Sequence, residues 1–120
     1  WRRDITCLYA AADCMVLTSD NEGMPVTLIE AAMAGVPSVT TNVGSAREVV
    51  LDGVTGLVVA PSAAAVADGL VRLLDNDLRH RMGAAARARA ETEFCTQRLI
   101  ADHEALYERL LVADGSADAG

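Results

Sequence analysis

Two glutamates, Glu22 and Glu30, flank the start of an expected helix within the segment 19–35. The segment runs from the end of an expected strand through a glycine-containing loop into a helix N-terminus, where open α/β sheets bind ligands. The free amides of Val26 and Thr27, together with the helix dipole, attract anions such as a diphosphate. Carboxylates repel phosphate but accept hydrogen bonds from neutral hydroxyls. A diphosphate with a hydroxyl-bearing group on each side is the outline of a nucleotide sugar.

Glu30 lies one turn beyond Val26, at the border of the apolar stripe of this helix. Partial burial of an unpaired carboxylate costs on the order of several kcal/mol, so we expect Glu30 to have hydrogen-bond donors. Ribose hydroxyls would serve as donors. Spacing alone leaves a second interpretation open, in which Glu30 only caps or solvates a helix edge.

The apolar pattern predicts an alternation of helices and strands. Strands are expected at 14–18, 37–41 and 57–60, and helices at 5–12, 25–34, 45–50, 63–74, 77–93 and 99–110. We place Pro25 in the first turn of the second helix and Ser45 at the N-cap of the third. Such alternation is typical of a parallel sheet in a doubly wound, Rossmann-like α/β fold. A parallel sheet needs covered faces and neighbouring strands, so this one is expected to be incomplete at its N-terminal side.

The length of 120 residues suits one domain or part of one. We assign residues 1–112 to the C-terminal part of a nucleotide-sugar-binding domain and residues 113–120 to a flexible tail. The chain starts at Trp1 and enters a helical pattern almost at once, which we interpret as a cut through a longer protein.

The charge of the chain restricts its partners. The formal net charge is -7, which argues against binding to nucleic acid or to anionic membrane surfaces. All ten basic residues are arginine, so a bound phosphate would need backbone amides, an arginine, or a lysine outside this segment. No apolar run reaches the roughly 20 residues of a membrane span. Cys7, Cys14 and Cys95 lack metal-ligand spacing and are expected to be free thiols in a reducing, cytoplasmic compartment.

A longer motif surrounds the two glutamates. Residues 22–39 resemble the pattern E-G-F-G-x-x-x-L-E-A-M-A-x-G-x-P-V-V, and the flanking segments 9–13, 42–50 and 52–59 agree with the resemblance. On these residues the chain resembles the family-4 retaining glycosyltransferases of GT-B fold, also called glycosyltransferase group 1. The resemblance runs from about Ile5 to Leu111.

The resemblance implies roles for individual residues. Glu22 would contact hydroxyls of the donor sugar, as the catalytic residue of this segment, and Glu30 would contact the ribose. Amides near Gly23, Met24 and Val26 would face the sugar and the phosphates. No metal and no cofactor are implied, and the donor is a nucleotide diphosphate sugar.

The chain departs from the family pattern at Met24 and Pro25, where phenylalanine and glycine are usual. Proline has no amide hydrogen, so a bond that the usual glycine donates is lost. The family's phosphate-binding arginine and lysine lie upstream of this chain, as does the whole acceptor domain.

We therefore interpret the chain as the donor-binding segment of an enzyme that transfers a hexose to an acceptor with retained configuration. The segment alone is expected to be inactive, and its partners to be a nucleotide sugar and an N-terminal acceptor domain. Two alternatives remain open: a non-catalytic remnant or interaction module of the same fold, and half of a GT-B-like sugar epimerase or phosphorylase.

Weaker features have structural explanations. The segment 75–77, which imitates a metal-binding aspartate pair, is expected to be a turn or helix cap. We expect His103 to pack at the edge of the core and His80 to face solvent. The charged residues of 87–93 are expected to form a solvated face.

Overall fold

The computed structural model describes residues 1–117, with side chains described through residue 111. Along the chain the elements are α1 (Ile5–Ala11), β1 (Met15–Leu17), α2 (Val26–Met33), β2 (Ser38–Thr41), α3 (Ala46–Val49), β3 (Gly56–Val59), α4 (Ala63–Arg72), α5 (Asn76–Glu93) and α6 (Thr96–Ala117). The order of helices and strands expected from the apolar pattern is confirmed.

The three strands form one parallel sheet in the order β1-β2-β3. Val16, Val39 and Leu57 lie opposite one another across it. Every residue of β2 is buried, as expected for the central strand of a parallel sheet. Within residues 1–117, β1 pairs only with β2, and its other edge is unpaired. The predicted parallel α/β fold is confirmed.

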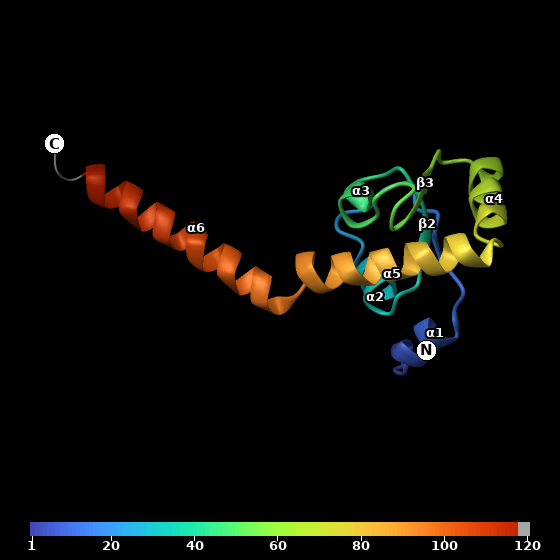
Figure 1. The fold of residues 1–120 in the computed structure, drawn as a ribbon. Helices are drawn as coiled ribbons and strands as arrows, with labels where there is room; N and C mark the ends of the chain where they lie inside the picture. The colour runs from blue at the N-terminus through green and yellow to red at the C-terminus, as the bar shows by residue number, and fades with distance from the viewer. Residues whose placement is uncertain (118–120) are drawn as a thin grey trace.

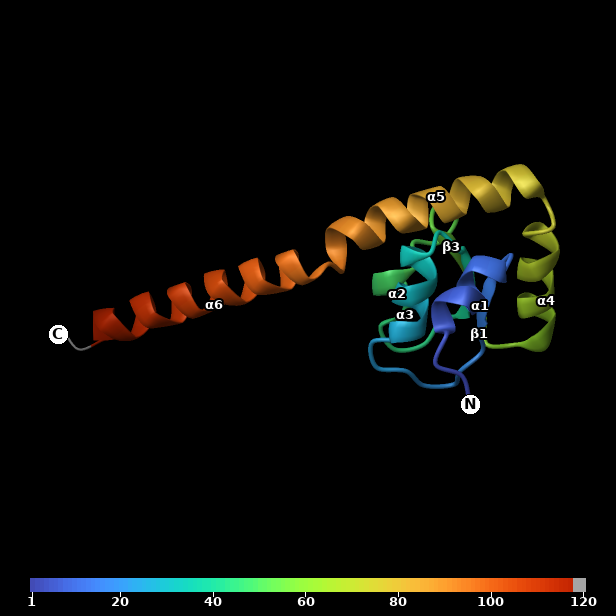
Figure 2. The ribbon, with the colours of Figure 1, turned by 90° about the horizontal axis from the view of Figure 1, so that it is seen from below.

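Helices cover both faces of the sheet. Figure 2 shows α4 on the side of the sheet opposite α2 and α3. Two separate apolar clusters result. The cluster on the side of α2 and α3 is formed by Leu28, Ala46, Val49 and Val50. The cluster on the other side contains Val39, Leu57, Leu73 and Met82.

Small residues allow α5 to pack closely against α2. Ala32, Ala86 and Ala90 are buried together at this contact. A Cβ atom at Gly83 would lie 2.2 Å from the carbonyl oxygen of Gly35, so only glycine fits there. Gly35 has a φ of +76°, in the left-handed region, and the chain turns at this residue after α2. Together these contacts fix α2, which carries Glu30.

Helix α6 leaves the α/β body at the end of α5 and extends away from it (Figure 1). Its exposed large apolar side chains are Leu99, Ile100, Leu106, Tyr107, Leu110 and Leu111. The prediction that His103 packs at the core edge is wrong, because α6 carries it away from the body and the residue is exposed. Within the described residues, no helix has both the length and the apolar character to cross a bilayer. Helix α6 runs into the expected tail 113–120, whose last three residues lie outside the described part.

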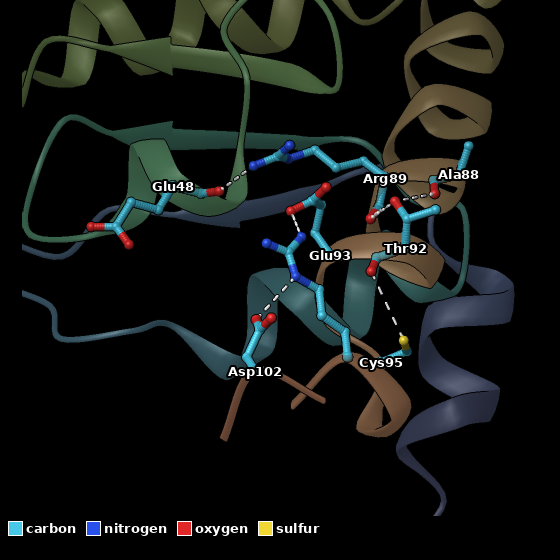
Figure 3. Close-up of polar contacts among 8 residues, drawn as sticks. Glu48, Ala88, Arg89, Thr92, Glu93, Cys95 and Asp102 are labelled. Atoms are coloured by element: carbon cyan, nitrogen blue, oxygen red, sulfur yellow. Dashed lines mark hydrogen bonds and ion pairs between the residues drawn. The ribbon is translucent and has the colours of Figure 1, made fainter. Parts of the chain in front are cut away.

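The end of α5 corrects one expectation about the charged segment 87–93. Arg89 is only partly exposed: it donates from Nη2 to the Glu48 carbonyl at 2.9 Å, and its guanidinium lies 5.8 Å from the centre of the Phe94 ring. Figure 3 shows this contact near Glu93 and Asp102. Both of these carboxylates pair with Arg98 at the start of α6. Arg89 therefore joins α5 to α3, because its neighbours offer a carbonyl and an aromatic face.

Candidate functional site

The loop between β1 and α2 lies at the carboxyl edge of the sheet and is tied to the chain that follows β2. The Thr41 hydroxyl, at the end of β2, donates to the Ser19 carbonyl at 2.7 Å. The Ser45 amide donates to the Gly23 carbonyl at 3.3 Å. These two bonds hold the loop from both ends, so its shape depends on the neighbouring strand and loop as well as on its own residues.

Glu22 is held within this loop. The Ser19 hydroxyl donates to Glu22 Oε1 at 2.6 Å, and the side chain is half-buried. Gly44 packs against the Glu22 backbone so closely that no side chain fits between them. The carboxylate therefore has a neutral hydroxyl partner and a fixed backbone, and it remains able to accept further hydrogen bonds.

Helix α2 begins directly after Glu22, Gly23, Met24 and Pro25. Pro25 is the buried N-cap, which differs from the expected place in the first turn, and no side chain caps the helix. The predicted substrate-binding residues Gly23, Met24, Val26 and Thr27 are all exposed. The first amides of a helix lack intrahelical partners, so the start of α2 offers donors and partial positive charge to an anion.

Glu30 lies in the second turn of α2 and is exposed, so the expected partial burial is wrong. It nevertheless has a hydrogen-bond donor from the protein. The Tyr9 hydroxyl, from α1, donates to Glu30 Oε2 at 3.0 Å. Glu22 and Glu30 thus lie on either side of the helix start, and each has a hydroxyl donor: Ser19 of the same loop for Glu22, and Tyr9 of α1 for Glu30.

A cavity of about 330 Å³ lies beside Glu30, between α1 and α2. Its lining includes Ile5, Tyr9, Ile29 and Met33. A second cavity of about 460 Å³ lies at the ends of β1 and β2, against α4. The first is the one that a ligand bound to Glu30 would reach.

Sequence reasoning missed the residues that support the two glutamates: Ser19, Thr41, Gly44 and Tyr9. In the sequence, Ser19 directly follows the strand expected at 14–18, and Tyr9 lies within the helix expected at 5–12. The hydroxyl groups of Ser19 and Tyr9 were the only indication that these residues could form hydrogen bonds. A hydroxyl group in a sequence does not identify its partner.

Other features of the sequence have structural roles. Asp75 is the N-cap of α5 and accepts from the Leu78 amide at 3.0 Å, which confirms the expected cap. Cys7, Cys14 and Cys95 are free, and His80 is exposed, both as expected. The described residues contain no group of three or more histidines, cysteines or acids that could hold a metal ion.

A parallel α/β sheet with a two-glutamate loop and helix at its carboxyl edge is the arrangement of a GT-B glycosyltransferase. The family model described as "Glycosyl transferases group 1" matches residues 1–89 of this chain. The chain belongs to that family.

Individual relatives agree with this assignment. N-acetyl-alpha-D-glucosaminyl L-malate synthase of Bacillus anthracis is 35% identical over 109 residues, which cover 89% of this chain and 29% of that protein. Sucrose-phosphate synthase from Thermosynechococcus elongatus has a TM-score of 0.81 at 30% identity, covering 88% of this chain and 27% of that one. HepE from Anabaena, in complex with UDP and glucose, has a TM-score of 0.79 at 26% identity, covering 93% and 30%. The chain spans less than a third of the length of each of these relatives.

Proposed function

We propose that this chain is the second half of the nucleotide-sugar-binding domain of a retaining glycosyltransferase. The complete protein would transfer a hexose from a nucleotide diphosphate sugar to an acceptor with retained anomeric configuration. The observation that carries the proposal is the pair of glutamates on either side of the α2 N-terminus, each with a hydroxyl donor. The solved complex of HepE with UDP and glucose supports the same ligand class.

Each end of the donor has its own residues in this proposal. Glu22 accepts hydrogen bonds from sugar hydroxyls, and Glu30 accepts them from ribose hydroxyls. The diphosphate lies between them at the amides around Gly23, Met24 and Val26, with Thr27 next to them in the first turn. Each group of the donor thus meets either a carboxylate or backbone donors, according to its charge.

This arrangement would act on the transfer step through positioning and charge. When the bond from the anomeric carbon to the diphosphate breaks, negative charge develops on the leaving phosphate. The start of α2 directs amide donors and the positive end of its dipole toward that charge. Glu22 would hold the sugar so that the anomeric carbon faces the acceptor. The proposal includes no metal ion or cofactor.

We further propose that the isolated chain is inactive. The acceptor half and the upstream phosphate-binding cations that the family resemblance implies are needed for transfer. The three free thiols support a cytoplasmic location for the complete protein.

The complete protein provides the test. Isothermal titration with UDP, GDP and ADP should identify a nucleotide that binds, and Glu30→Gln should weaken that binding. A charge-assisted hydrogen bond contributes about 1.5–3 kcal/mol, which corresponds to a loss of roughly tenfold to a hundredfold in affinity. Glu108→Gln, an exposed glutamate on α6, is the matched control and should leave affinity unchanged. Equal affinities of Glu30→Gln and the parent protein would show that Glu30 does not contact the ribose.

A further inference from the structure

Tyr9 lies near the end of α1 and is buried, with 8% of its surface exposed. Its ring packs with Ala31 and Val36, residues in and just beyond α2. The position of the ring is therefore fixed by the contact between α1 and α2, and the hydroxyl at its tip is fixed with it.

That hydroxyl is directed at the Glu30 side of α2. It lies 3.0 Å from Glu30 Oε2 and 3.3 Å from the Thr27 carbonyl oxygen, and its single proton can be donated to either. The shorter contact to a charged acceptor is the stronger one. Burial and the Glu30 carboxylate both raise the pKa of Tyr9, so the hydroxyl keeps its proton at neutral pH and remains a donor.

An exposed glutamate on a helix has several rotamers of similar energy, and a ligand that needs one of them must restrict the side chain on binding. Among the described residues, Tyr9 supplies the only hydrogen bond to the Glu30 side chain. It restricts one carboxylate oxygen and leaves the other available. The cavity of about 330 Å³ that both residues line gives a ligand access to that side chain.

We propose that Tyr9 is a positioning residue, which holds the Glu30 carboxylate in the orientation that accepts the ribose hydroxyls of the donor. This inference rests on the proposed function, because it needs a nucleotide at Glu30. Tyr9 itself would not touch the reacting atoms.

The test is a double-mutant cycle in the complete protein, with Tyr9→Phe, Glu30→Ala and the double variant. The probes are whichever of UDP, GDP and ADP binds most tightly and the 2′,3′-dideoxy analogue of that nucleotide. Tyr9→Phe keeps the buried ring and should weaken binding of the ribonucleotide roughly five- to tenfold. It should not change binding of the dideoxy analogue, and it should have no further effect once Glu30 is alanine.

Tyr107→Phe, on the exposed part of α6, is the matched control and should bind both probes like the parent protein. An equal loss for both probes would indicate a structural role for Tyr9 and overturn the inference. So would an unchanged affinity of Tyr9→Phe, or losses that multiply in the double variant. If the parent protein binds none of the three nucleotides, the proposed function itself fails, and this inference fails with it.

Discussion

Gly44 packs directly against the backbone of Glu22, so that a Cβ atom at position 44 would lie 1.8 Å from the Glu22 carbonyl oxygen. Gly44 also has a φ of +49°, a left-handed conformation that favours glycine. The loop after β2 thus determines where the loop after β1 can lie. The position of Glu22, which we propose contacts the donor sugar, therefore depends on a residue 22 positions further along the chain.

Replacing Gly44 with alanine should therefore displace Glu22. The added methyl group meets backbone atoms, which cannot rotate away, so the Glu22 loop must shift. A displacement of about 1 Å at a positioning residue can lower kcat/KM roughly a hundredfold, and we expect a loss of that size in the complete protein. Steady-state kinetics with the nucleotide sugar measures it.

Gly53→Ala is the matched control for this experiment. Gly53 has a φ of +75°, but a Cβ atom there would meet nothing within 4 Å. Both variants share the cost of a left-handed alanine, on the order of 1–3 kcal/mol in stability. Only Gly44→Ala should also lower kcat/KM. Similar kinetics for the two variants would contradict the role of Gly44.

The fold could be predicted from the sequence because its signals are local. The strands around Val16, Val39 and Leu57 are short apolar runs, and the helices between them have clear apolar periodicity. Both glutamates could be proposed as site residues for the same reason, since they lie in one continuous motif. The contacts that hold them were not predictable, because the partners of Glu22 and Glu30 include residues about twenty positions away.

The environments of two further side chains were predicted wrongly for a related reason. Arg89 occupies a charged stretch of sequence, and nothing nearby indicates the Glu48 carbonyl that it contacts. His103 lies on an apolar stripe of α6, which predicts burial only where another surface covers the stripe. Periodicity identifies the apolar side of a helix and gives no information about what covers it.

Arg89 should matter for stability far more than Arg87, two positions before it on α5. Arg89→Ala removes the bond to the Glu48 carbonyl and the packing on Phe94, and we expect it to lower the free energy of unfolding by about 2 kcal/mol. Arg87→Ala removes an exposed pair with Glu91 and should change stability little. Urea denaturation measures both variants. Equal destabilisation would mean that the contact between α5 and α3 is not important.

Cys14 should react more slowly than Cys7 with an alkylating reagent. Burial raises the pKa of the Cys14 thiol, with a further contribution from Asp13, whereas Cys7 is exposed. A raised pKa means less thiolate at a given pH, and the thiolate is the nucleophile. At pH 8 we expect iodoacetamide to label Cys7 faster than Cys14, with the difference decreasing as the pH rises. Peptide mass spectrometry gives both rates, and in urea they should converge. Equal rates in the folded chain would contradict the burial of Cys14.

Glu22 should separate binding of the nucleotide from turnover of the nucleotide sugar. It lies before the α2 amides, in a loop held by Ser19 and Gly44, and it is proposed to contact only the sugar end of the donor. Glu22→Ala should lower kcat/KM by roughly a hundredfold, a barrier change of about 2.7 kcal/mol, and leave nucleoside diphosphate affinity nearly unchanged.

Two further variants in the same loop sharpen this test. Ser19→Ala removes the hydroxyl that orients Glu22 but leaves the carboxylate itself in place, so it should lower kcat/KM in the same direction but by only about fivefold. Asp20→Ala removes an exposed carboxylate two positions before Glu22 and should leave turnover near the parent value. If Glu22→Ala kept full activity, or lost nucleotide binding together with activity while still folded, Glu22 would not act at the sugar. A loss for Asp20→Ala as large as that for Glu22→Ala would instead attribute the effect to the charge of the loop, because both variants remove one negative charge from the same segment.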